Sequence, residues 1–269
     1  KHNHQKFIDY NIRDVQVVDK IDKQTGLMDL ALIVAYKGGV NYNDAFGTTG
    51  IWDSIIYRYL SDRKIAVPPA TRKHKDPYPG GYVKEPKVGM TEWVTSFDLN
   101  SLYPNLIVQY NMSPETLVKG DDFTASGVEH YLKNPVSNDP IERNLSVAAN
   151  GSMYRKDERG VFPTIIIGLY DERAEIKKEM LRLKQENENA NSSELKREIN
   201  RLENTQQAIK ILLNSLYGAL GNQYFRYFEM LIAEGITLSG QLSIKWAEQA
   251  MNKAMNNILK SDDEDYVIA

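Results

Sequence analysis

The chain has 269 residues, of which 42% are hydrophobic and 26% charged, the balance of an ordinary globular protein with one large domain or two smaller ones. Cysteine is absent, which excludes a disulfide framework and a cysteine-ligated zinc site and favours a reducing intracellular setting. No run approaches the roughly 18 apolar residues of a membrane span, and no signal-like segment indicates export. The formal net charge of −3 argues weakly against a nucleic-acid binder.

Positive charge is nevertheless concentrated between residues 58 and 87, a stretch that is also rich in proline and glycine. A basic loop of this kind could follow a phosphate backbone, or it could be a solvated linker. The segment contains eight basic residues against three acidic ones, the basic ones being Arg58, Arg63, Lys64, Arg72, Lys73, Lys75, Lys84 and Lys87.

In chain order, apolar spacing predicts a helix around residues 7–18 and mostly apolar helical segments over residues 27–60. Proline and glycine predict a loop over residues 65–90. Side chains alternate between apolar and polar over residues 92–98, which predicts a strand, and a short helix is expected near residues 102–110.

The second half of the chain is mainly helical in pattern. Residues 169–188 and 193–217 form two long helical patterns, separated by the asparagine-rich residues 187–191, and this arrangement predicts a helical hairpin. A further helix is expected over residues 233–259. Residues 266–269 resemble the first half of a strand, so we expect both ends of the chain to be cut from something longer. The fold class predicted is α+β.

The most specific motif is the heptapeptide from Asp98 to Pro104. The predicted strand delivers a carboxylate at its end, where Mg²⁺ ligands commonly collect, and the turn that follows offers backbone N–H groups to phosphate oxygens. Tyr103 lies just behind and could stack on a sugar or base. An isolated aspartate at a strand end would more often be structural, but the whole heptapeptide is more specific than that.

The hairpin carries a second set of candidate residues. Lys210, Asn214 and Tyr217 are spaced to share one helix face, followed by Gly218, while Arg173 and Lys177 share a face of the opposing helix. Arginine and lysine here could contact phosphate. The alternative is that these are solvated cations above a core tyrosine, as on any charged helical hairpin.

These residues resemble four motifs of family B DNA polymerases, in family order. Residues 98–104 resemble motif A (D-x-x-S-L-Y-P), residues 210–218 motif B (K-x3-N-S-x-Y-G), residues 78–81 the Y-x-G-G element, and residues 10–14 the third exonuclease motif (Y-x3-D). Residues 113–116 and 213–221 suggest the T-even bacteriophage branch. Asn100 and Asn105 are minor departures, standing where that branch usually has Thr and Ser.

The resemblance implies a role for each matching residue. It assigns metal binding to Asp98 with the backbone carbonyl of Leu99, catalysis to Asp98 and Lys210, and the exonuclease remnant to Tyr10 and Asp14. It assigns nucleotide binding to Ser101, Leu102, Tyr103, Arg173, Lys177, Lys210, Asn214 and Tyr217, with Tyr103 excluding a 2′-hydroxyl. It assigns template-DNA contact to Tyr78, Gly80 and Gly81. The cofactor implied is Mg²⁺, two ions in the complete site.

The resemblance also implies an organisation: residues 1–66 end an exonuclease domain with connecting helices, 67–168 begin the palm, 169–218 are the fingers hairpin, and 219–269 are a palm helix and the start of the motif C strand. Motif C itself would begin just past Ala269, and the thumb is absent. A two-metal site needs carboxylates on both sides of the ion pair. We therefore expect the chain alone to be inactive in primer extension, and a second chain or a missing C-terminal part to supply motif C and the thumb.

Two functional interpretations remain open from the sequence. In the first, the chain is part of an enzyme of template-directed DNA synthesis, acting on primer–template DNA and deoxynucleoside triphosphates inside a cell, in the host cytoplasm if phage-encoded, without a membrane partner. In the second, it is a non-catalytic nucleotide- or DNA-binding module that keeps the polymerase fold. An unrelated helical scaffold protein is a distant third.

Overall fold

The computed structural model describes residues 3–71, 74–118, 127–134 and 138–268. These residues divide into two compact units, of which unit 1 comprises residues 1–55 and 171–212, and unit 2 residues 56–170 and 213–269. Arg72 and Lys73 of the basic segment, and Ala269 of the expected terminal strand, lie outside the described residues.

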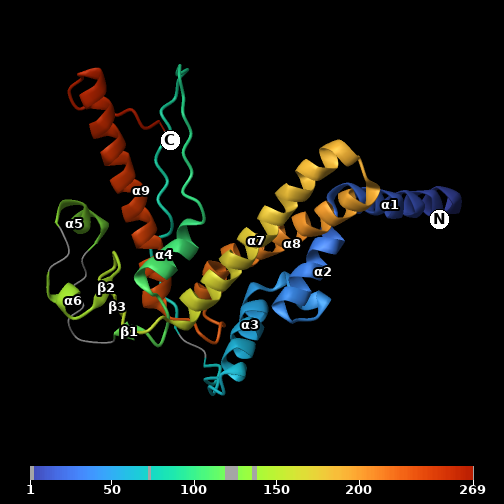
Figure 1. The fold of residues 1–269 in the computed structure, drawn as a ribbon, viewed down its shortest axis with the longest axis horizontal. Coiled ribbons are helices and arrows are strands. Elements are labelled where there is room, and N and C mark those ends of the chain that lie inside the picture. The colour runs from blue at the N-terminus through green and yellow to red at the C-terminus, as the bar shows by residue number, and fades with distance from the viewer. Residues whose placement is uncertain (1–2, 72–73, 119–126, 135–137, 269) are drawn as a thin grey trace. The chain divides into compact units, whose positions relative to one another are not determined.

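The described residues are mainly helical and include one small sheet (Figure 1). No helix among the described residues combines the length and apolarity needed to cross a membrane. The elements are α1 His4–Thr25, α2 Leu27–Gly38, η1 Tyr42–Phe46, α3 Thr48–Asp62, α4 Leu102–Tyr110, β1 Leu117–Val118, α5 Val128–Lys133, α6 Asn138–Glu142, β2 Leu145–Val147, β3 Met153–Arg155, α7 Val161–Ala190, α8 Ser193–Leu220 and α9 Met230–Leu259.

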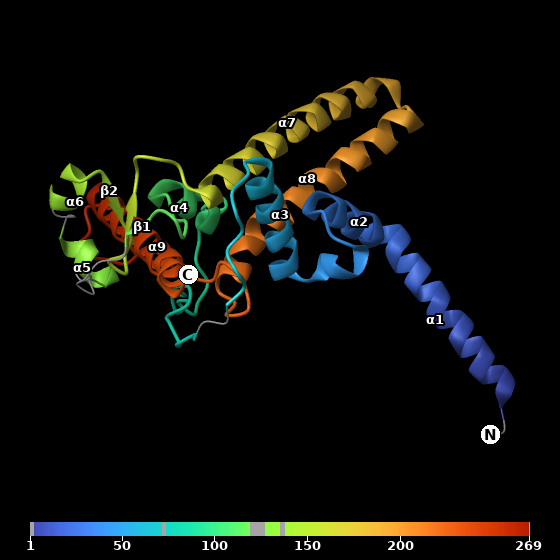
Figure 2. The same cartoon turned by 90° about the horizontal axis from the view of Figure 1, so that it is seen from below.

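The helical hairpin expected over residues 169–218 is confirmed: α7 and α8 run side by side in opposite directions, joined by a short turn (Figures 1 and 2). Within unit 1 its seam is apolar, because each helix contributes residues spaced by three and four, the buried ones being Met180, Leu183, Ile199 and Leu202. The hydroxyl of Ser192 caps α8 by accepting the N–H groups of Glu194 and Leu195.

The remaining helices of unit 1 differ in burial. Val34 of α2 and Ile51 of α3 form a buried cluster with Ala208 and Leu212 of α8. By contrast, α1 has no buried residue and projects beyond α2 as a single long helix (Figure 2). The helix predicted around residues 7–18 is therefore present, but its apolar side chains do not build the core.

Unit 2 is built on α9, which packs against α4 and α5. The helices predicted near residues 102–110 and over residues 233–259 are both confirmed, as α4 and α9. The sheet has three antiparallel strands in the order β1-β3-β2, with Tyr154 of β3 opposite both Leu117 and Ser146. The buried ring of Tyr154 places this sheet in the core of the unit. An α+β fold is confirmed.

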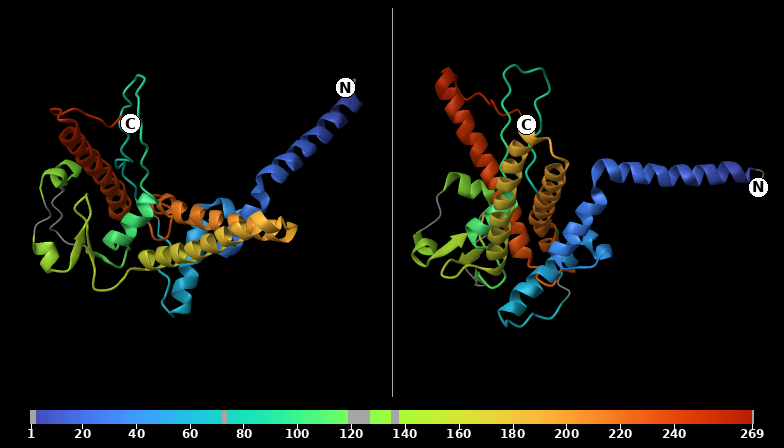
Figure 3. Two further views of the ribbon diagram at one scale, coloured as in Figure 1. Left: turned by 45° about the horizontal axis from the view of Figure 1, so that its top comes forward. Right: turned by 45° about the vertical axis from the view of Figure 1, so that its right-hand side comes forward.

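The strand predicted over residues 92–98 is wrong. Trp93 has a φ of 59°, which interrupts an extended strand at its beginning, and no described residue pairs with the rest of the segment. Trp93 is 98% and Phe97 75% exposed, so neither face of the expected strand is covered. Residues 75–100 instead leave and rejoin the body of unit 2 as one long excursion, seen beside α9 in both panels of Figure 3.

The terminal strand expected over residues 266–269 is also not formed by its described part, residues 266–268. The backbone N–H of Lys87 donates to the carbonyl of Ile268 at 2.9 Å, but a single bond of this kind does not make a ladder. Side chains, not a backbone ladder, hold this segment in place.

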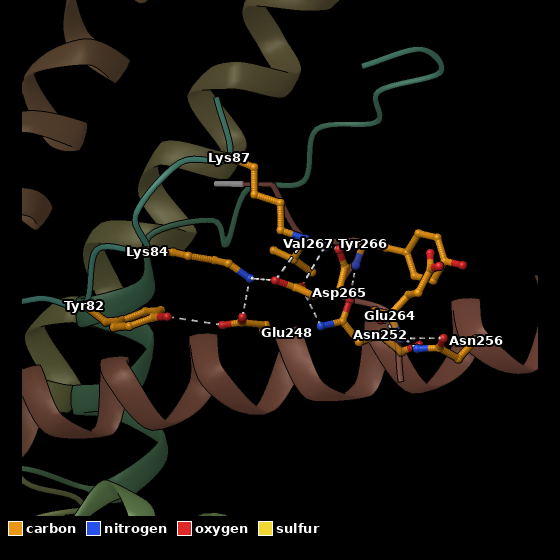
Figure 4. Close-up of polar contacts among 10 residues, drawn as sticks. All are labelled: Tyr82, Lys84, Lys87, Glu248, Asn252, Asn256, Glu264, Asp265, Tyr266 and Val267. Carbon is orange, nitrogen blue, oxygen red and sulfur yellow. Dashed lines mark hydrogen bonds and ion pairs between the residues drawn. The ribbon is translucent and has the colours of Figure 1, made fainter. Parts of the chain in front are cut away.

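A polar stripe on α9 provides those side-chain contacts (Figure 4). We call Gln241, Lys245, Glu248, Asn252 and Asn256 the α9 stripe, because spacings of three and four place them on one helix face. Glu248 accepts from Lys84 at 2.5 Å, and Lys84 also contacts Asp265 at 2.7 Å. Asn252 donates to Asp265, and the stripe therefore joins residues 82–87 to residues 264–267.

These ion pairs shift the two titrating groups in opposite directions. The pKa of Asp265 is held well below its usual range, first by the hydrogen bond from Lys84 and then by that from Asn252. Burial would lower the pKa of Lys84, but its bonds to Asp265 and Glu248 outweigh burial and raise it. Both shifts favour the charged pair near neutral pH.

Asn111 connects the end of α4 to the beginning of α7. It caps α4 with a φ of 58°, a conformation that asparagine tolerates better than most residues. Its amide nitrogen donates to the carbonyls of Arg155 at 2.6 Å and Glu158 at 2.8 Å, and its amide oxygen accepts from the N–H of Gly160 at 2.9 Å. One buried side chain thus fixes the turn between β3 and α7.

The first turn of α7 is held by the segment that suggested the phage branch, residues 113–116. The Glu115 carboxylate accepts the N–H of Val161 at 2.6 Å, so a negative charge lies at the helix N-terminus, where the helix dipole favours it. A Cβ on Gly160 would lie 2.6 Å from the Cβ of Ser113, which restricts position 160 to glycine. The first turn of α7 is therefore fixed within unit 2.

We expect Asn111→Ala to destabilise the chain by about 2–4 kcal/mol, because it removes three hydrogen bonds made by a buried side chain and strains an αL position. Asn105→Ala is the control, since exposed Asn105 makes one side-chain bond, to the carbonyl of Asn100. Urea unfolding of both variants measures the difference. Equal losses would show that Asn111 contributes no more than an exposed asparagine.

We expect Asp265→Asn to remove part of the acid sensitivity of the fold. A lowered folded-state pKa means that the stabilisation is present above the unfolded value of about 3.9 and is lost as the pH falls toward the folded value. Because Asp265 is partly exposed, its contribution is at most about 1 kcal/mol. Unfolding free energies measured between pH 3 and 7 should therefore fall less steeply below pH 4 in Asp265→Asn than in the exposed control Asp262→Asn.

Candidate functional site

Three tyrosines from separate motifs meet in unit 2. Tyr103 lies in the first turn of α4 and Tyr217 near the end of α8, and their ring centroids are 4.7 Å apart with the planes inclined by 52°. Burial raises the pKa of the Tyr217 hydroxyl, with a further contribution from its hydrogen bond with Tyr78. The pKa of Tyr103 is also raised, first by burial and then by the neighbouring Tyr78. The hydroxyls of Tyr103 and Tyr217 therefore stay neutral and remain hydrogen-bonding groups at physiological pH.

Glycines surround this tyrosine cluster, which we define as Tyr78, Tyr103 and Tyr217. A Cβ on Gly221 would lie 2.9 Å from the hydroxyl of Tyr78, and one on Gly81 would lie 3.1 Å from the hydroxyl of Tyr103. A Cβ on Gly240 would lie 2.9 Å from Cε1 of Tyr103. The backbone thus approaches the rings closely on several sides, which only glycine permits without displacement.

Residues 78–84 are held against α9 and the end of α8. Gln241 of the α9 stripe donates to the carbonyl of Gly80 at 2.6 Å. Lys75 donates to the carbonyl of Gly221 at 2.7 Å, with its ammonium 5.5 Å from the centre of the Tyr78 ring. The Y-x-G-G segment is therefore positioned by contacts at both of its ends.

The basic segment is only partly available to a phosphate backbone. Lys84 and Lys87 both pair with Asp265, and the side chain of Lys84 is only 15% exposed. Arg63 lies over the ring of Tyr59. Lys84 in particular acts as an internal tether, which the sequence interpretation of this stretch did not anticipate.

Asp98 lies in the exposed segment just before α4, and Leu99 beside it is 48% exposed. Ser101 follows as the N-cap of α4 with a φ of 49°, so the first helical N–H groups, from Leu102 on, are at a helix N-terminus as expected. The amide of Asn105 donates to the carbonyl of Asn100 and helps to fix this turn.

A metal ion at Asp98 would find a carboxylate and the carbonyl of Leu99, which are the oxygen ligands that Mg²⁺ prefers. Among the residues with defined positions, however, no three His, Cys, Asp or Glu side chains come together to hold a metal ion. Asp98 and Leu99 therefore offer suitable ligand atoms for Mg²⁺, but the described residues do not supply enough ligands to complete a site.

The cations of the hairpin are arranged along two helices of unit 1. Arg173 is half-buried and donates through Nε to Gln206 at 3.2 Å, across the hairpin. Lys177 and Lys210 are exposed, and neither forms an ion pair with a residue whose position the structure defines. The apolar neighbours Ile209 and Leu213 are buried, which leaves Lys210 and Asn214 on the outer face of α8.

Tyr10 and Asp14 are both exposed on α1, and Tyr10 is 65% exposed. Among the described residues, Asp14 is not part of any group of three or more His, Cys, Asp or Glu side chains that could hold a metal ion. Both residues lie in the helix that was expected around residues 7–18.

Sequence reasoning missed Gly240 and the α9 stripe. The sequence contained a signal for the stripe, because polar residues recur at helical spacing within the helix expected over residues 233–259, namely Gln241, Lys245, Glu248 and Asn252. Several partners of the stripe are distant in sequence: Lys84 lies 164 positions from Glu248, and the carbonyl of Gly80 lies 161 positions from Gln241. The spacing could therefore not identify what the stripe binds.

Comparison with known proteins identifies a family. Residues 49–266 match the family described as DNA polymerase family B. The chain is 34% identical, over 99% of its length, to the DNA-directed DNA polymerase of Escherichia phage RB69, and 33% identical, over 99%, to that of Enterobacteria phage T4. It spans 34% of each of these relatives, about a third of their length.

A solved structure supports the fold. The family B DNA polymerase from the archaeon Pyrobaculum calidifontis superimposes with a TM-score of 0.66 at 21% sequence identity, covering 93% of this chain and 29% of that one. The family match covers most of the chain, and the phage relatives are those of the branch that the sequence motifs indicated. The chain belongs to DNA polymerase family B.

Proposed function

We propose that the chain is the nucleotide-selecting part of a DNA polymerase, in which it helps to transfer nucleotides from deoxynucleoside triphosphates to a primer 3′-hydroxyl. The observation that carries this proposal is the convergence of Tyr78, Tyr103 and Tyr217. These residues come from three separate motifs of the resemblance and are up to 139 positions apart. A scaffold protein would have no reason to bring them together.

Tyr103 is the proposed sugar-selecting residue. Tyr103 is the second residue of α4 and follows Ser101 and Leu102, whose backbone N–H groups are the proposed ligands of the triphosphate. A ring placed against C2′ of the sugar leaves no room for a hydroxyl there. Tyr217 and Asn214, on the same helix as Lys210, are proposed to line the pocket of the new base pair.

Arg173, Lys177 and Lys210 are the proposed triphosphate clamp, and Tyr78, Gly80 and Gly81 the proposed template contact. Lysine and arginine stabilise phosphate oxygens by charge-assisted hydrogen bonds. For Arg173, the bond to Gln206 holds the guanidinium in one orientation while its other nitrogens remain available as donors. The fixed Y-x-G-G backbone suits close approach of a nucleic-acid strand, since glycine has no side chain to obstruct it.

Asp98 and the carbonyl of Leu99 are the proposed metal ligands of this chain. Two Mg²⁺ ions, when bound, would supply charge neutralisation on the triphosphate. One carboxylate cannot hold two such ions, so we propose that further polypeptide, in this or another chain, contributes the opposing carboxylate. We refer to the complete enzyme as the assembled polymerase.

The alternative is a non-catalytic module that binds nucleotide or primer–template DNA and never completes the metal site. Primer extension by the assembled polymerase, with Mg²⁺ and all four deoxynucleotides, separates the two functions. Extension that disappears in Asp98→Asn supports the enzyme. Retained DNA binding with no extension under any condition would leave the binding module.

We expect Tyr103→Ala to raise the incorporation of ribonucleotides relative to deoxynucleotides by at least about tenfold in the assembled polymerase, a difference of roughly 1.4 kcal/mol in selectivity. Tyr103→Phe is the matched control, because it keeps the ring and removes only the hydroxyl beside Gly81. Single-nucleotide incorporation kinetics measure the ratio. An unchanged ratio in Tyr103→Ala would reduce Tyr103 to a core residue.

We expect Lys210→Ala to weaken the use of incoming nucleotide about tenfold or more, because a charge-assisted phosphate contact contributes roughly 1.5–3 kcal/mol. The melting temperature should hardly change, since Lys210 is exposed. Lys178→Ala removes another exposed hairpin lysine and should change neither quantity. Pre-steady-state kinetics and melting curves test this, and a loss of stability with nucleotide use intact would rule out the clamp.

A further inference from the structure

The ring of Tyr103 is packed between the backbone at two glycines, Gly240 and Gly81, and the ring of Tyr217. Gly240, a buried residue of α9, lies so close that a Cβ there would come within 2.9 Å of Cε1 and 3.6 Å of Cδ1 of Tyr103. At the other end of the ring, a Cβ on Gly81 would lie 3.1 Å from the hydroxyl. Tyr217 occupies a third side at a centroid distance of 4.7 Å.

We propose that Gly240 is a specificity-determining residue, which sets the position of the Tyr103 ring and through it the space left for the sugar of the incoming nucleotide. This inference rests on the proposed role of Tyr103 and extends it to a residue in a different helix. Gly240 is a positioning residue in this role, because it touches Tyr103 and not the substrate.

The crowding at position 240 cannot be relieved easily. Carbon atoms normally approach to about 3.5–4.0 Å, so a methyl group at 2.9 Å forces a shift of at least about half an ångström. Tyr103 is a rigid ring whose hydroxyl end meets Gly81 and whose face meets Tyr217. Leu102 is also within 3.6 Å of the added atom, so the start of α4 resists the displacement too. A methyl group at position 240 would therefore push the ring away from α9, and under the proposed role of Tyr103 this changes the space left for the sugar.

A second glycine of α9 provides a matched comparison. Gly235 is buried like Gly240, and an added Cβ there would lie 3.1 Å from Asn150 Oδ1 and 3.3 Å from Ser152 Oγ and the Tyr154 hydroxyl. Those neighbours form a polar cluster beside the sheet and do not include Tyr103. Gly235→Ala and Gly240→Ala thus make the same chemical change in the same helix and crowd different groups.

The first measurement is the melting temperature of the chain in a double-mutant cycle of Gly240→Ala and Tyr103→Ala. Alone, Gly240→Ala should lower the melting temperature by about 2–6 °C, because overpacking outweighs the gain in helix propensity. In the Tyr103→Ala background the same change should be neutral or stabilising, because the ring is gone. Gly235→Ala should have the same effect with or without Tyr103.

The second measurement is incorporation kinetics in the assembled polymerase. Gly240→Ala should raise the apparent KM for deoxynucleotide by about fivefold or more with a smaller change in kcat, and should not increase ribonucleotide use. The changes in KM and kcat should both disappear when Tyr103 is alanine. Gly235→Ala should leave the KM and the ribo-to-deoxy ratio at their starting values.

The outcomes separate the inference from the function on which it rests. Coupling to Tyr103 in both measurements supports the inference. If the effect of Gly240→Ala on the melting temperature depends on Tyr103 but its effect on KM does not, the two residues share a packing contact only, and the inference is overturned. The inference is also overturned if neither effect depends on Tyr103. Failure of Tyr103→Ala to change the ribo-to-deoxy ratio is a different result, seen without any change at Gly240, and it overturns the proposed sugar selection itself.

Discussion

Close approach to the backbone of α9 is the constraint on which the rest of unit 2 depends. At Gly235 the polar side chains of Asn150, Ser152 and Tyr154 come against the helix, and at Gly240 the ring of Tyr103 does so. These contacts bring the sheet and the start of α4 to the same helix within five positions of each other. A side chain at either glycine would separate α9 from one of them, so the site and the core share one packing requirement.

The site is assembled from segments that are each secured separately. Asn111 and Glu115 fix the turn that leads into α7, α8 continues as a regular helix to Leu220 and carries Tyr217, and the α9 stripe holds Gly80. Because the supports are independent, the three tyrosines do not rely on each other alone for their position. Such support from surrounding side chains is what a site with sub-ångström requirements needs.

The sequence was informative where structure is determined locally. The hairpin of α7 and α8 and the helices α4 and α9 were predicted from residue spacing, since a helix satisfies its own backbone and shows its period directly. The motifs also identified the tyrosines that the structure brings together. The strand over residues 92–98 failed because a strand requires a partner, and alternation alone cannot supply one. The contact of Gly240 with Tyr103 could not be predicted either, since a single glycine in a helix does not indicate which distant side chain packs against it.

The contacts around Lys84 have a consequence for how this region can vary among relatives. Two chain segments 178 or more positions apart are joined by the ion pairs of Lys84 and Lys87 with Asp265, and Glu248 is the second acceptor of Lys84. Losing Lys84 alone would leave the Glu248 carboxylate without this lysine and Asp265 with Lys87 alone, and losing Asp265 alone would leave two lysines with one acid. Evolutionary change here should therefore be correlated: a lineage that replaces Lys84 is expected to replace Glu248 or Asp265 as well, and coupled substitution at these positions would be the record of this tether.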